Sequence, residues 1–147
     1  MATTDSPGYV LDISESLFRL TTEGVRLRSN ETLAYETISS LISHRTAQLE
    51  GGIRQKSAII REHLSCIPTD GEIKLRLDIC RTSASTLDDI KDMLSQQLGS
   101  ALTLGDALSI LLFDYVAERK AARVLEKIGL DGTNGQQQRR SRLGDAN

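Results

Sequence analysis

The chain has 147 residues and carries 18 Lys and Arg against 20 Asp and Glu, a formal net charge of −2. Its length fits one domain or two very small ones. The slight negative charge argues against a purely electrostatic nucleic-acid binder, which would be basic. With 39% hydrophobic residues and no Trp, the core must be aliphatic, and no apolar run approaches the roughly 18 residues of a membrane span.

The N-terminus and the cysteines indicate where such a protein resides. The opening stretch MATTDSPGYVLDISES is polar and acidic, unlike a signal peptide. Cys66 and Cys80 show no metal-ligand spacing, which favours buried, reduced thiols. We therefore expect a cytoplasmic protein that needs neither a membrane nor a cofactor.

In chain order, residues 1–23 are expected to form a flexible N-terminal segment. The stretch GVRLR alternates apolar and Arg side chains over residues 25–28, which predicts a short strand. Asn30 can cap the helix that follows, and the glycines at 51–52 are expected to end it. A second helix is predicted over residues 54–65.

The stretch GEIKLRLDIC, residues 71–80, gives the clearest strand pattern, because Ile and Leu alternate with charged side chains. Helices are predicted over 85–98 and 103–128, each starting at a Ser or Thr with an Asp three residues later. Residues 131–147 are polar and lack a core-forming pattern, so they are expected to be a disordered tail.

The order strand, helix, helix therefore occurs twice, with apolar positions that match at a spacing of about 50 residues. A single strand is not stable in water, so the two strands are expected to pair. The predicted fold is mostly α-helical with a short two-stranded antiparallel ribbon, built from units at 24–67 and 72–130. The apolar side chains of both strands would face the helices, and the charged ones would face outward.

Three stretches of the second unit, IKLRLDI, STLDDIKDMLSQQLG and TLGDALSILLFDYV, resemble the ribbon-helix-helix DNA-binding proteins. The stretches VRLR, NETLAYETISSLISH and IRQKSAIIREHLSCI fit the same template less closely. Most members of that family dimerise to make the ribbon, so a chain with two units resembles the single-chain tandem members, such as TraY-type accessory proteins of DNA-transfer relaxosomes. The resemblance implies a tandem pseudo-dimer that binds double-stranded DNA in plasmid conjugation or in transcription regulation.

A two-stranded ribbon fits the major groove of DNA, where Arg and Lys can bind guanine and Asp can accept from cytosine. The base-reading candidates are the charged side chains of the two predicted strands: Arg26, Arg28, Lys74, Arg76 and Asp78. The solvated face of a half-buried sheet would show the same alternation. In this family the start of the second helix also binds backbone phosphate, since its free N–H groups favour an anion. The resemblance thus implies phosphate contacts at Gly52, Ile53, Arg54, Lys56, Thr103 and Leu104.

Enzyme activity is not expected, because His44 and His63 lie far apart and no nucleophile, phosphate-loop or metal motif occurs. A DNA-binding protein of this kind would have a relaxase or another protein as a partner through its last helix or tail, and could form homo-oligomers on DNA. Two alternatives stay open. An antitoxin-type repressor would bind its toxin through the tail, and a helical adaptor would bind a protein without binding DNA.

Overall fold

The computed structural model describes residues 8–48, 53 and 55–129. In chain order the elements are β1 (Gly8–Ile13), α1 (Glu15–Thr32), α2 (Ile38–Gln48), α3 (Ser57–Cys66), β2 (Ile73–Asp78), α4 (Arg81–Leu98) and α5 (Leu104–Lys127). Contacts group residues 1–115 into one compact unit and residues 116–147 into another, so α5 contributes to both. The prediction of a mostly helical protein with a two-stranded antiparallel sheet is confirmed.

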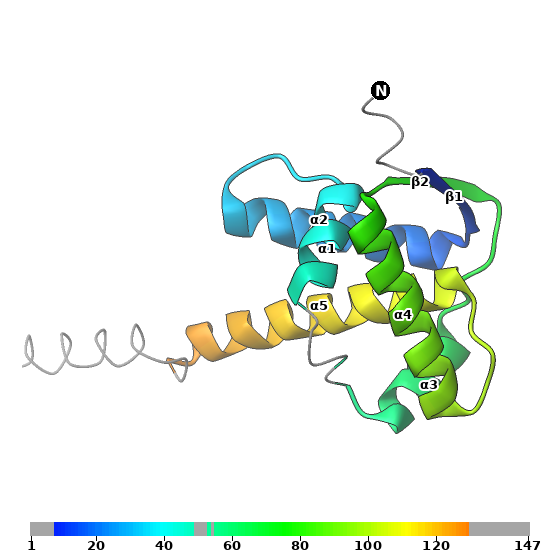
Figure 1. Cartoon of the computed structure of the whole chain (residues 1–147). Coiled ribbons are helices and arrows are strands. Elements are labelled where there is room, and N and C mark those ends of the chain that lie inside the picture. The colour runs from blue at the N-terminus through cyan, green and yellow to red at the C-terminus, as the bar shows by residue number, and fades with distance from the viewer. Residues whose placement is uncertain (1–7, 49–52, 54, 130–147) are drawn as a thin grey trace, which may run out of the picture. The chain divides into compact units, whose positions relative to one another are not determined.

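Strands β1 and β2 pair antiparallel as a two-stranded ribbon, seen side by side in Figure 1. In this register Val10 lies opposite Arg76, with Gly8 opposite Asp78 at one end and Asp12 opposite Lys74 at the other. The side chains that alternate with these residues along each strand face the helices. They are Tyr9, Leu11, Ile13, Ile73, Leu75 and Leu77, of which Ile13 and Leu77 are almost completely buried. The helices therefore supply the apolar support that a two-stranded ribbon needs.

The partner of β2 is not the strand predicted at residues 25–28. Those residues lie inside α1, where Leu27 is buried together with Leu17 and Gly24 on one helical face. An alternation of only four residues does not distinguish a strand from a helix, because the apolar face of a helix can also include residues at positions i and i+2. The prediction that residues 1–23 are a flexible segment is also wrong for 8–23, which form β1 and the first half of α1.

Helices α1 and α4 have the same length, and each follows a strand of the ribbon. Each has 18 residues, and their N-caps are Ser14 and Cys80. We call the separation in sequence between these two N-caps the segment offset. The C-caps, Leu33 and Gly99, are related by the same offset, and both adopt left-handed backbone conformations with φ of 57° and 70°. The segment offset is thus longer than the predicted repeat of about 50 residues.

The same offset relates side-chain hydrogen bonds after each helix. The hydroxyl of Ser29 accepts from the backbone N–H of Glu36 at 3.1 Å. The hydroxyl of Ser95 accepts from the backbone N–H of Leu102, also at 3.1 Å. Both bonds fix the short connection to the next helix. We call residues 8–48 the first segment and residues 74–114 the second segment.

The next helix in each segment, α2 or α5, begins with a reciprocal capping box. The Thr37 hydroxyl accepts from the N–H of Ser40 at 3.0 Å, and the Ser40 hydroxyl accepts from the N–H of Thr37 at 2.9 Å. Thr103 and Asp106 make the equivalent pair at 3.1 and 3.0 Å. The two helices therefore start at equivalent points, again related by the segment offset.

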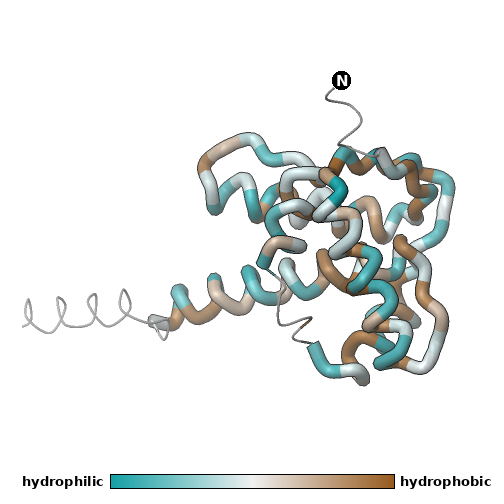
Figure 2. Tube along the Cα trace, in the orientation of Figure 1, coloured by the Kyte–Doolittle hydropathy of each residue, from teal (hydrophilic) through white to brown (hydrophobic). Residues whose placement is uncertain are grey.

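The core lies between the ribbon and the helices, and α2 contacts α1, α4 and β2. Figure 2 shows hydrophobic residues recurring along these elements, as amphipathic helices require. The largest completely buried side chains among the described residues are aliphatic, as the composition predicts, apart from Tyr115; they include Leu17, Leu41, Ile42, Ile60, Leu77, Leu87, Leu94 and Leu108.

Helix α3 has no equivalent in the second segment and belongs to the connection between the segments. His63 on α3 is buried, bonds the Ser109 hydroxyl at 2.7 Å and stacks on the Phe113 ring at 4.4 Å. Burial lowers the pKa of His63.

After α3 the chain passes closely against the end of β1, where a Cβ on Gly71 would lie 2.5 Å from the carbonyl oxygen of Ile13. Glycine is therefore required at this crossing.

Three further expectations concern the termini, membranes and cysteines. The tail predicted at 131–147 lies outside the described residues. None of the described helices combines the length and the apolar character that crossing a bilayer requires. Cys66 and Cys80 are free thiols but are exposed rather than buried, because Cys66 is the last residue of α3 and Cys80 precedes α4.

Candidate nucleic-acid interface

The outward face of the ribbon is the part of the fold that brings predicted site residues together. Lys74, Arg76 and Asp78 alternate with the buried residues of β2 and are exposed, as predicted. Strand β1 adds Val10, which is 58% exposed, and Asp12. Because side chains alternate across a strand, these five residues share one face.

Charges on this face nearly cancel. The Lys74 ammonium pairs with Asp12 at 2.5 Å across the end of the ribbon. Both side chains are more than half exposed, so this pair adds little to stability. Arg76 lies opposite Val10 at the centre, and none of the ion pairs between described residues includes Arg76 or Asp78. Within that part of the chain, the face therefore presents one free cation, one free carboxylate and one neutralised pair.

The N-termini of α2 and α5 lie near opposite ends of the ribbon. At one end the Ser39 hydroxyl accepts from the backbone N–H of Asp78 at 3.0 Å, which ties α2 to β2. At the other end Gly105 stands at the position equivalent to Ser39, and a pocket of about 510 Å³ separates α5 from β1. A Cβ at Gly105 would meet no atom closer than 3.7 Å, so the missing side chain contributes to this open space.

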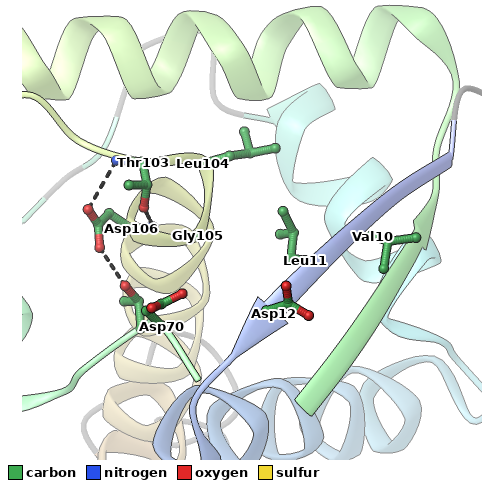
Figure 3. Close-up of a pocket in the computed structure, with 9 residues that line it drawn as sticks. Val10, Leu11, Asp12, Asp70, Thr103, Leu104, Gly105 and Asp106 are labelled. Carbon is green, nitrogen blue, oxygen red and sulfur yellow. Dashed lines mark hydrogen bonds between the residues drawn. The ribbon is translucent and has the colours of Figure 1, made fainter. Parts of the chain in front are cut away.

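Figure 3 shows the pocket between β1 and the start of α5. Three carboxylates line it, from Asp12, Asp70 and Asp106. Asp106 is satisfied by its capping bond and by the Thr69 hydroxyl at 2.7 Å, and Asp12 is paired with Lys74. The pocket is therefore an acidic site, which repels phosphate more than a bare helix N-terminus would.

A carboxylate also lies at the start of α2. Glu36 accepts from the hydroxyls of Ser40 at 2.7 Å and Thr32 at 2.9 Å. These hydrogen bonds, that of Ser40 first, lower the pKa of Glu36, so it is ionised at neutral pH. Both helix starts thus carry a negative charge that partly offsets the attraction of their N–H groups for an anion.

Two predicted base readers do not lie on the ribbon. Arg26 is on α1 and pairs with Glu23 at 2.8 Å, and hydrogen bonding to Glu23 raises the pKa of Arg26. Arg28 is also on α1, where it contacts Glu31 at 3.1 Å and the His44 ring at 3.3 Å. Their assignment as base readers depended on the strand at 25–28, which is helical, so it is withdrawn.

The predicted phosphate-binding residues fall into three groups. Thr103 and Leu104 lie at the start of α5 and line the pocket, as the resemblance implies for a second helix. Ile53 and Lys56 precede α3, which is the connecting helix, so they do not start the second helix of the first segment. Gly52 and Arg54 lie outside the described residues.

Sequence reasoning missed Val10, Asp12 and Ser39, although one signal was present. The tripeptide Leu-Asp-Ile occurs at 11–13 and again at 77–79, and each copy is followed by a small capping residue.

No protein-family model, curated protein or solved structure matches the chain. No cluster of metal-ligating side chains occurs within the described part of the chain. The chemistry of the interface must therefore be inferred from its own geometry.

Proposed function

We propose that this chain is a sequence-specific double-stranded DNA-binding protein whose β-ribbon enters the major groove. One observation carries the proposal: the exposed face of a two-stranded antiparallel ribbon presents Lys74, Arg76 and Asp78 beside Val10 and Asp12. A two-stranded ribbon has the width of the major groove, and these side chains can bind base edges there. The start of a helix lies beside each end of the ribbon.

We further propose that the first and second segments are two ribbon-helix-helix units in one chain, a tandem pseudo-dimer. The constant segment offset supports this, since helix caps and helix starts recur at it. In this arrangement the first unit is β1, α1 and α2, and the second is β2, α4 and α5. Helix α3 then serves to carry the chain from one unit to the other.

Charge determines how such binding should depend on salt. Residues 68–116 carry four basic and eight acidic residues, and the ribbon face is nearly neutral. Each phosphate neutralised contributes about 0.9 to the slope of log affinity against log salt. With few cations available, the slope should be about 2 to 3, and base contacts should supply most of the specificity.

Selection from random duplexes, followed by affinity measurements, tests the proposal. Arg76→Ala should weaken the selected site by about 1–3 kcal/mol relative to unrelated duplex, because it removes a guanine contact. The matched control is Arg26→Ala, which removes the same charge from α1 and should have little effect. Equal losses in the two variants would contradict the ribbon assignment. A wild-type protein that ignores duplex DNA at low salt would contradict the proposal itself.

Such binding could serve relaxosome assembly, with a relaxase as partner, or transcriptional repression, including repression by an antitoxin. The genes adjacent to this one distinguish these uses. A relaxase gene would favour DNA transfer, a toxin gene would favour the antitoxin, and a metabolic operon would favour repression.

A second candidate function, a helical adaptor, is favoured by the C-terminal part of α5. Val124, Leu125 and Ile128 in residues 116–129 are 41–56% exposed, which costs hydrophobic free energy unless a partner covers them. Replacing Val124 and Ile128 by Ser should abolish protein binding and leave DNA binding unchanged if the two functions are separate. Co-purification with the product of an adjacent gene measures the first effect.

A further inference from the structure

The two strands of the ribbon present different side chains at equivalent positions. At the segment offset, Gly8 corresponds to Lys74 and Val10 corresponds to Arg76, whereas Asp12 corresponds to Asp78. Val10 and Arg76 also lie opposite each other, so they occupy the centre of the ribbon. A ribbon formed by two identical strands would show the same residues on both sides of its centre, and this one does not.

The two ends of the ribbon differ in hydrogen-bonding character. At one end Lys74 donates to Asp12, and its ammonium keeps two further donors for an outside acceptor. At the other end Asp78 lies over Gly8, its Oδ1 atom 3.5 Å from the place where a glycine Cβ would be. Among the described residues no cation pairs with this carboxylate, so that end offers only acceptors. One end is thus a donor site and the other an acceptor site.

The two residues at the centre of the ribbon also differ in hydrogen-bonding capacity. Arg76 can fork to the O6 and N7 atoms of guanine, whereas Val10 has no polar atom and can only pack against a thymine methyl group. Val10 is 58% exposed, although an apolar side chain gains nothing from facing water. Contact with a methyl group in the groove would bury it.

We propose that the ribbon reads a non-palindromic duplex in one orientation. The Lys74 end contacts guanine, the Asp78 end contacts the amino group of cytosine, and the centre pairs a guanine contact from Arg76 with a thymine methyl contact from Val10. This inference rests on the proposed function and adds to it the symmetry of the target and the base expected at each end.

Hybrid duplexes test the inference without any mutation. The selected site is divided at its centre, and each half is duplicated by inversion to give two perfect palindromes. The wild-type protein should bind both palindromes at least about 5-fold more weakly than the selected site, because each lacks one set of base contacts worth about 5- to 150-fold. Equal affinity for a palindrome and the selected site would overturn the inference.

A symmetrised ribbon provides the matched gain-of-function test. The double variant Gly8→Lys with Val10→Arg places the same outward residues on both strands, and the backbone of Gly8 does not require glycine. Selection with this variant should return a palindrome. The control, Gly8→Ala with Val10→Ile, adds no donor, acceptor or charge to either end and should keep an asymmetric site. Circular dichroism melting establishes whether each variant is folded, and if one is not, the hybrid duplexes decide.

The outcomes separate the two proposals. If the wild-type protein binds no duplex, both fail. If it binds duplex DNA and its selected site is palindromic, DNA binding stands and asymmetric reading fails.

Discussion

The first segment (residues 8–48) and the second segment (residues 74–114) have the same backbone plan and different side chains. Both contain a strand, an 18-residue helix with a left-handed C-cap and a second helix preceded by a capping threonine. What they retain is mostly local: caps, turns and the inward positions of the strands. The shared features indicate that local hydrogen bonds determine the backbone fold of each segment. The side chains that differ between the segments lie at the contacts between the two segments and on the outward face of the ribbon.

The largest expected effect comes from a buried ion pair between the segments. Arg45 on α2 pairs with Asp114 on α5 at 3.0 Å, with side chains 6% and 2% exposed, and the guanidinium lies over the Tyr115 ring. Asp114→Asn should lower the free energy of unfolding by about 3–5 kcal/mol, because it removes one charge of a buried ion pair and keeps the other. Chemical denaturation measures this loss.

The matched control for that pair removes both charges. Arg45→Leu with Asp114→Leu should cost much less than the single change, since the position equivalent to Arg45 is already Leu111. A single variant that loses under about 1 kcal/mol would mean that the ion pair does not determine which helices pack together.

A buried glycine provides the next test of the comparison. Gly24 on α1 corresponds to Ile90 on α4, which is 4% exposed. A Cβ at Gly24 would lie 2.9 Å from Leu41 Cδ2 and 3.4 Å from Leu112 Cδ2. Gly24→Ile should therefore destabilise the protein by about 1–3 kcal/mol through overpacking, although isoleucine is the equivalent residue in the other segment. Thermal unfolding compared with Gly24→Ala measures the effect, and equal stability of the two variants would argue against close packing here.

The C-caps give a smaller effect of opposite sign in the two segments. Leu33 is 90% exposed at a φ of 57°, so its side chain gains little packing and the left-handed conformation is unfavourable. Leu33→Gly should stabilise the protein by about 1 kcal/mol, and Gly99→Leu should destabilise it by about 1–2 kcal/mol. Urea midpoints of both variants check this; a loss of stability in Leu33→Gly would show that the leucine makes a contact worth more than its strain.

The smallest expected effect is a pH dependence from His63, whose partner Ser109 corresponds to Ser43 in the first segment. Burial holds the pKa of His63 below its unfolded value near 6.5, so the unfolded chain binds the proton more tightly. The free energy of unfolding is therefore highest above the unfolded pKa, where His63 is neutral in both states. It decreases as the pH falls from the unfolded pKa toward the folded pKa, because the unfolded chain takes up the proton first. Unfolding free energies at pH 5.5 and 7.5 should differ more in wild type than in His63→Gln, and the same difference in both would contradict this assignment.

The sequence predicted some elements because their patterns were unambiguous. In β2, apolar and charged residues alternate without interruption, so Lys74, Arg76 and Asp78 were correctly placed on the outward face. The cap pair of Thr103 and Asp106 likewise predicted the start of α5. These signals are local, and the forces behind them act between residues close in sequence.

The rest could not be predicted because it depends on contacts between distant residues. Strand β1 contains Tyr9, Val10 and Leu11 in succession, and the outward direction of Val10 is set only by pairing with β2. The helix at 54–65 was predicted, close to the observed α3, but its place as a connector follows from Gly71 and from the packing of His63. Asp12 belongs to the site only because Lys74 lies opposite it.

The connection through α3 has a consequence for assembly at low abundance. Because both strands of the ribbon come from one chain, their pairing is intramolecular and does not depend on protein concentration. A ribbon shared between two chains falls apart below its dissociation constant, whereas covalent connection supplies an effective concentration of the order of millimolar. Cutting the chain between α2 and α3 would make folding a reaction between two fragments, with a melting temperature that falls on dilution. The intact chain keeps its outward face complete even when a single molecule is present.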